Sequence, residues 1–111
     1  MPRLTSAADE LKRVLCVNFV NFVRFAGEMT VEQIVSRRWA SITFTGERHE
    51  MKLRLEGCGA AAAADSFLGR IAEREFPLRG HIVADIAIVS DERLSDDLVR
   101  LRLEALTVEA G

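Results

Sequence analysis

Apolar residues recur at every second position in several stretches of the sequence. The alternation is clearest where charged residues separate Met51, Leu53 and Leu55, and it returns in residues 80–90 and 98–109. Successive side chains of a β-strand point to opposite faces, so this spacing predicts strands with one buried face. A sheet of this kind needs a second layer over its apolar face, which limits the chain to a layered fold.

A β-hairpin turn is predicted at residues 45–48. Gly46 occupies the first central position, which suits a two-residue type II′ turn. The resulting register gives three facing pairs: Ile42 with Met51, Ala40 with Leu53, and Trp39 with Arg54.

The third and fourth predicted strands, residues 80–90 and 98–109, form a second antiparallel pair. A register that matches their apolar faces and avoids like charges gives two facing pairs, Asp85 with Arg102 and Ile86 with Leu101. The charged residues between them, 91–97, are predicted to form a loop.

Helices are predicted on either side of the hairpin. Residues 6–26 have helical spacing behind a possible N-cap at Ser6, and residues 60–75 have an apolar stripe rich in alanine. Thr30 begins a possible capping box, which predicts a short helix at residues 31–37.

These elements predict one α+β domain covering residues 1–111. It is a two-layer sandwich whose four-stranded, mostly antiparallel sheet, in the order ααββαββ, has helices packed on it. Residues 14–25 leave an alternative open, because they are rich in Val and Phe, which favour strands. A strand there gives a ferredoxin-like βαββαβ order with an extra strand.

The composition favours a cytoplasmic bacterial protein. Cys16 and Cys58 lie in different predicted elements and form no C-x-x-C pair, as in a reduced chain. Charged residues interrupt the N-terminus, so no signal peptide is expected, and no segment has the roughly 18 apolar residues of a membrane span. Of the 15 basic residues only Lys12 and Lys52 are lysines, which suggests a GC-rich genome.

One face of the predicted sheet is polar. It is shared by five basic residues: Arg48, Lys52, Arg54, Arg100 and Arg102. Acidic residues dilute this charge, the net charge is −2, and Trp39 is the sole aromatic residue expected there. Sheets that bind RNA stack bases on several exposed aromatics, so the sequence argues against a nucleic-acid partner.

The turn at residues 57–61 is a candidate anion site. It joins a strand to a helix, and free N–H groups at a helix N-terminus attract phosphate or carboxylate. Its candidate residues are Gly57, Gly59, Ala60 and Ala61. The preceding strand alternates, whereas a dinucleotide site follows a strand buried on both faces, so no cofactor is predicted.

Cys58 in this turn is the one candidate nucleophile. A helix N-terminus stabilises a thiolate, and His49 or His81 would have to supply the base. His81 and Asp85 share a strand face, but four residues of strand separate them by about 13 Å, so no metal site is predicted.

An apolar patch on the third and fourth strands is a candidate interface. Its members are Val83, Ala87, Val89, Leu98, Leu106 and Val108. Coverage by the first helix, or a bulge near Ala105, would explain the patch within one chain. Otherwise it predicts a homodimer, since symmetric dimers are the commonest oligomers.

The sequence therefore favours a non-catalytic association module, acting as a homodimer or as a partner-binding domain. The alternative function is a small-ligand or anion-binding protein, including an enzyme, centred on the turn at residues 57–61.

Overall fold

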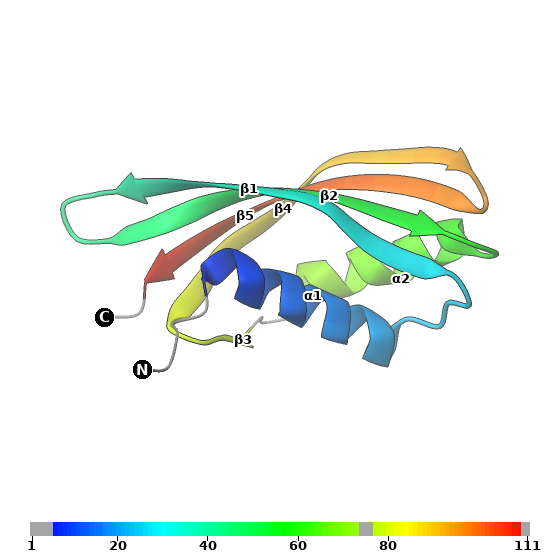
Figure 1. Ribbon diagram of the computed structural model, residues 1–111, viewed down its shortest axis with the longest axis horizontal. Coiled ribbons are helices and arrows are strands. Elements are labelled where there is room, and N and C mark those ends of the chain that lie inside the picture. The colour runs from blue at the N-terminus through cyan, green and yellow to red at the C-terminus, as the bar shows by residue number, and fades with distance from the viewer. Residues whose placement is uncertain (1–5, 74–76, 110–111) are drawn as a thin grey trace.

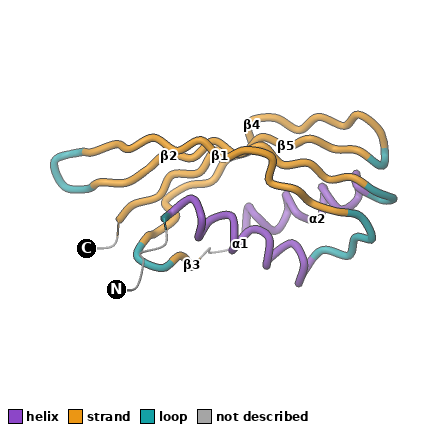
Figure 2. The backbone as a smooth tube through the Cα atoms, viewed as in Figure 1, coloured by secondary structure: helices purple, strands orange, loops and turns teal. Residues whose placement is uncertain are grey.

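The computed structural model describes residues 6–73 and 77–109, in which two helices lie on one side of an antiparallel sheet (Figures 1 and 2). The elements in chain order are α1 (Ala7–Phe22), β1 (Glu28–Ala40), β2 (Thr45–Glu56), α2 (Ala60–Glu73), β3 (Pro77–Leu78), β4 (His81–Ser95) and β5 (Leu98–Glu109). The strand order in the sheet is β1-β2-β5-β4-β3, and β3 is only two residues long. The predicted α+β class and antiparallel sheet are confirmed, but the order of elements differs.

The predicted helix at residues 31–37 is wrong, because these residues belong to β1. Val31 lies opposite Leu53 and Ile34 lies opposite Met51, with a register shift at Glu32 between them. A β-bulge inserts one extra residue, so two inward-facing residues stand three positions apart instead of two. That spacing resembles the spacing of a helix, and the helix prediction, which rested on a capping box beginning at Thr30, did not anticipate the bulge.

The predicted turn at residues 45–48 is also wrong, since β1 and β2 are joined by residues 41–44. The Ser41 N–H donates to the Phe44 carbonyl oxygen at 2.7 Å, and Ser41 Oγ accepts from the Phe44 N–H at 3.0 Å. The three predicted facing pairs of the hairpin are replaced by Met51 with Ile34, Leu53 with Val31, Arg54 with Thr30, Trp39 with Gly46, and Ala40 with Thr45.

Gly46 lies inside β2, where it allows two strands to approach closely. A Cβ atom built on it would stand 1.9 Å from the Thr107 carbonyl oxygen of β5. The glycine therefore marks a close backbone approach within the sheet, and not a turn.

The register predicted between the third and fourth strands is wrong, although both strands are present. Asp85 lies opposite Leu106, and Arg102 lies opposite Ser90. Ile86 lies opposite Ala105 instead of Leu101. Register shifts at Ala84, Val89 and Leu94 displace the pairing, and β4 continues to Ser95, so most of the predicted loop at residues 91–97 is strand.

The helix interpretation of the N-terminal segment is confirmed, and the ferredoxin-like alternative is wrong. Ser6 caps α1 by accepting from the Asp9 N–H at 3.1 Å, and the helix ends at Phe22. The predicted helix at residues 60–75 is present as α2 up to Glu73, while residues 74–76 lie outside the described part of the chain. Neither helix is long and apolar enough to cross a membrane within the described residues.

The hydrophobic core lies between the two helices and the inner face of β2 and β5. Phe67 of α2 meets Phe19 of α1 edge to face, with ring centroids 5.4 Å apart. Buried alanines on α2 bring this helix close to the sheet. The inner face of the sheet contributes Met51, Leu53, Leu55, Val99, Leu101 and Leu103. Both helices lie below the sheet in Figure 1, and no described element covers its outer face.

Candidate association surface

The outer face of β2 and β5 carries charges arranged in rows across the two strands. Glu50 lies directly opposite Glu104, and the next outward position along each strand places Lys52 opposite Arg102. Beyond that row, Arg54 lies opposite Arg100. Like charges at directly facing positions of neighbouring strands destabilise an isolated sheet. The outer face therefore holds an acidic row beside two basic rows.

Only part of this charge is neutralised within the chain. Arg48 Nη1 lies 3.1 Å from Glu104 Oε1, and Arg54 pairs with Glu56 on its own strand. A second group of outer-face charges forms no hydrogen bond or ion pair with any residue that the structure describes: Glu50, Lys52, Arg100 and Arg102. The centre of the outer face thus presents one acidic and three basic side chains to the solvent.

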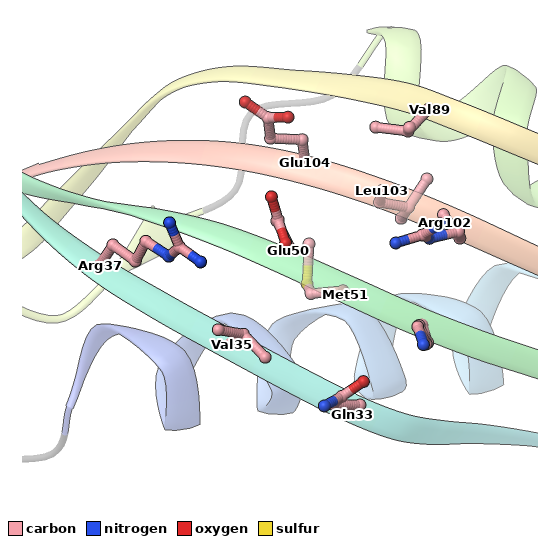
Figure 3. Close-up of a pocket in the computed structure, with 10 residues that line it drawn as sticks. Gln33, Val35, Arg37, Glu50, Met51, Val89, Arg102, Leu103 and Glu104 are labelled. Carbon is pink, nitrogen blue, oxygen red and sulfur yellow. The ribbon is translucent and has the colours of Figure 1, made fainter.

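Two shallow hollows lie on either side of Lys52 and Arg102. The hollow shown in Figure 3 has a volume of about 270 Å³, and it extends past Glu50 to Val35 and Arg37 of β1. The other has a volume of about 290 Å³ and extends to Glu92 and Arg100. The outer face is therefore not flat, because a hollow lies on each side of its charged centre.

The hairpin end of the outer face is more apolar. Trp39 and Leu106 line a depression of about 450 Å³ there, with Arg37, Arg38 and Arg48 around it. The indole Nε1 of Trp39 is buried and has no hydrogen-bond partner among the described residues. Trp and Arg are both enriched in protein interfaces, so this end of the face resembles an interface in composition.

The structure does not gather the predicted interface residues into one patch. Val83 packs against the core, and Val89 is a bulged residue that is 57% exposed. Leu98 and Val108 mark opposite ends of β5 on the outer face, where Leu106 and Ala87 also lie. Neither helix covers this face, and the nearby bulges are in β4 instead of beside Ala105.

The N–H groups of the candidate anion turn already have acceptors within the chain. Those of Gly57 and Ala61 donate to the carbonyl oxygens of Asp97 and Asp96, both at 2.9 Å. The Gly59 N–H donates to Asp97 Oδ1 at 3.4 Å, and the Ala60 N–H donates to the Gly57 carbonyl oxygen at 3.1 Å. The Asp97 carboxylate thus stands where a bound anion would have to lie.

Cys58 has no histidine base beside it. The cysteine is exposed just after β2, whereas His49 lies seven residues before the end of that strand, a separation of about 23 Å. His81 begins β4 and pairs with Glu109, at the end of the sheet away from Cys58. No group of three His, Cys, Asp or Glu side chains within the described residues is arranged to hold a metal ion.

His49 instead joins three strands through buried hydrogen bonds. Its Nδ1 atom lies 2.7 Å from Ser36 Oγ of β1, and its Nε2 atom lies 2.9 Å from Thr107 Oγ1 of β5. Burial lowers the pKa of His49, and this effect outweighs the opposing charge of Glu47. A neutral imidazole between two hydroxyl groups is a structural link. The sequence could have revealed that His49 is buried, because it lies at every second position with Met51 and Leu53 and so points to the same inner face.

The prediction that five basic residues share one face is matched by the alternation of β2 and β5, which places Arg48, Lys52, Arg54, Arg100 and Arg102 outward. The sequence did not reveal which charges face each other, nor that Trp39 and Leu106 line one depression at the hairpin end. Searches with this chain matched no protein-family model, no curated protein and no solved structure.

Proposed function

We propose that this chain is a non-catalytic association module that forms a homodimer through the outer face of its sheet. The supporting observation is the acidic row of Glu50 and Glu104 lying next to the basic row of Lys52 and Arg102. A two-fold axis that runs across the strands between these rows sets each acidic row over the basic row of the other copy. A surface that pairs with itself about such an axis must be complementary to itself, and the two central rows meet this requirement.

The size of the outer face suits this role. Four long strands give a surface about 19 Å wide, and the paired length of β2 and β5 makes it about 36 Å long. A standard interface takes about 800 Å² from each partner, close to what this face offers. Arg48 and Arg54 lie outside the two central rows, although Arg48 pairs with Glu104 of the acidic row.

Charge reversal tests this arrangement directly. Lys52→Glu sets acidic side chains against acidic ones in both halves of the symmetric interface, and Glu50→Lys does the same with basic ones. We expect each single variant to weaken the dimer by at least about tenfold, because like charges across an interface are costly. The double variant Glu50→Lys with Lys52→Glu exchanges the two charges on β2, so opposite charges face each other again there, and it should restore the dimer. Native mass spectrometry and light scattering over a concentration series report the stoichiometry.

The matched control is Arg24→Glu, an exposed residue of the connection between α1 and β1. It reverses a charge away from the outer face and should leave the dimer unchanged. A parent protein that stays monomeric at millimolar concentration, or a double variant as weak as the singles, would remove the two-fold arrangement.

The alternative proposal, an anion or small-ligand site at residues 57–61, has less support because the N–H groups of the turn already have acceptors within the chain. Calorimetric titration with inorganic phosphate tests it, using the parent and Asp97→Asn. Saturable heat in the parent that is lost in Gly59→Ala would favour the alternative, because Gly59 has φ +84, a conformation that alanine rarely adopts.

A further inference from the structure

The two long strands at the edges of the sheet differ in regularity. Register shifts interrupt the pairing of β4 with β5 at three places, and β3 pairs with only the first residues of β4. At the other edge, β1 pairs with β2 without a shift from Gln33 to Ala40, a run about 26 Å long. Bulges protect an edge strand from pairing with another chain, whereas a regular edge strand offers a row of main-chain N–H and C=O groups. We call residues 33–40 the edge run.

The edge run is open to the solvent along its free side. β1 is the last strand of the sheet there, so no described strand lies beyond it. Figure 3 shows Val35 and Arg37 on this outermost strand, and both side chains are exposed, as is that of Ser36. An extended peptide laid beside such a strand joins the sheet through main-chain hydrogen bonds.

Arg37 carries an unpaired positive charge on the outer side of the edge run. It lies opposite Arg48 of β2, and Arg48 is itself paired with Glu104 at 3.1 Å. Arg37 forms no hydrogen bond or ion pair with any residue that the structure describes. Arg38 differs, because it is paired with Glu109 at 3.4 Å. An acidic side chain placed beside Arg37 would reduce the repulsion between two arginines that face each other.

Trp39 is the next residue of the edge run on the outer side. Together with Leu106 it lines the depression of about 450 Å³ at the hairpin end. When a peptide is added to a sheet as a strand, pockets for its alternate side chains provide specificity. The edge run thus offers a place for an acidic side chain and, two residues along, a place for an apolar one.

We propose that the edge run binds an extended peptide segment of a partner protein, which joins the sheet as a further antiparallel strand. The segment carries an acidic residue opposite Arg37 and an apolar residue opposite Trp39. A second copy of the edge run does not supply the acid, because residues 33–40 contain no Asp or Glu. The contact lies in the plane of the sheet, so it is separate from the face-to-face dimer and does not depend on it.

The probe is a synthetic peptide as long as the edge run, in which threonine alternates with leucine, glutamate and valine in that order. The antiparallel register sets the leucine opposite Trp39, the glutamate opposite Arg37 and the valine opposite Val35. Calorimetric titration measures the dissociation constant. All the proteins carry Lys52→Glu, so the proposed dimer makes no contribution and its failure would not affect the result.

Reversal of the charge at the edge tests the acidic position. Arg37→Glu should weaken binding of the peptide by at least about tenfold, and replacement of the peptide's glutamate with lysine should restore it. The matched control is Arg100→Glu. Arg100 also lacks a partner among the described residues and also faces a paired arginine, Arg54, but it lies on the central strand β5. This control should bind the peptide as tightly as the protein without it.

Methylation of the peptide's N–H groups tests the strand geometry. Alternate residues of an added antiparallel strand direct their N–H groups toward β1, and the remaining residues direct theirs toward the solvent. Two peptides are compared, each methylated at one of these alternate sets. One should lose binding and the other should keep it, because only one set bonds to the edge run.

Four results would overturn the proposal. The peptide with glutamate shows no saturable binding at millimolar concentration, or the two methylated peptides bind equally well. Arg100→Glu weakens binding as much as Arg37→Glu, which would place the peptide on the outer face. An oligouridylate binds more tightly than the peptide and is lost in Arg37→Glu, which would assign Arg37 to a single-stranded nucleic acid.

Discussion

The two faces of the sheet are made by alternate residues of the same strands, yet they do different physical work. On the inner face, Leu53 and Leu101 lie opposite each other and are fully buried beneath the helices. One residue away on the outer face, Lys52 and Arg102 lie opposite each other and are exposed. Burial of apolar surface makes the inner face the source of stability, whereas we propose that the rows of charge on the outer face serve association.

The largest expected effect separates the faces at two neighbouring residues of β5. Leu101→Ala should lower the free energy of unfolding by about 3 kcal/mol, because it leaves a cavity in the core. Arg102→Ala should change it by less than about 0.5 kcal/mol, as at most exposed sites. Urea denaturation at low protein concentration measures both without a contribution from association. Similar losses for the two variants would contradict the division between the faces.

Gly46→Ala should lower the free energy of unfolding by about 2 kcal/mol, since its Cβ atom meets the backbone of Thr107. Gly69→Ala is the matched control, because Gly69 lies in α2 with open space where the Cβ atom would stand. That change should stabilise the protein by about 0.5 kcal/mol. Thermal denaturation compares the two, and a harmless Gly46→Ala would show that β2 and β5 are not so close.

Thr107→Val should cost about 1 kcal/mol, because it keeps the shape of the side chain but leaves buried His49 Nε2 without a partner. Thr30→Val, on the exposed side of β1, should have almost no effect. Equal urea midpoints for the two variants would mean that the His49 link adds nothing to stability.

The smallest expected effect concerns pH. Burial lowers the pKa of His49 below its ordinary value of 6.5, so the unfolded chain binds a proton more readily than the folded one. The stability linked to the neutral imidazole is complete above pH 6.5 and falls as the pH drops from there through the folded pKa. His49→Gln should therefore lose less stability than the parent between pH 7 and pH 5, measured by urea denaturation. Parallel pH profiles would contradict this account.

The same comparison shows which parts of the structure the sequence could predict. Alternation identified residues 51–56 and 98–109 because their inner and outer residues differ sharply, and the alanine stripe identified α2. Local motifs were misleading at Thr30, where an apparent capping box lies in β1 beside the bulge at Glu32, and at Gly46, where a sheet glycine resembles a turn glycine.

The sequence could predict which basic residues lie on the candidate surface, but it could not predict which of them face each other. Alternation placed the basic residues on one face, yet the facing of Lys52 with Arg102 depends on registers that bulges and loops set through contacts far apart in sequence. Bulges at Ala84 and Val89 of β4 likewise change the facing of Val83 and Val89, so alternation along that strand could not show which residues share a face.

The most direct test of the proposed dimer is to mix the Glu50→Lys and Lys52→Glu proteins. Each variant should be largely monomeric alone, but together they set basic rows against acidic rows. Native mass spectrometry should then show a heterodimer as stable as the parent dimer or more so. Variants that dimerise alone, or a mixture that contains only monomers while the parent is a dimer, would contradict the proposal that the outer face pairs with itself.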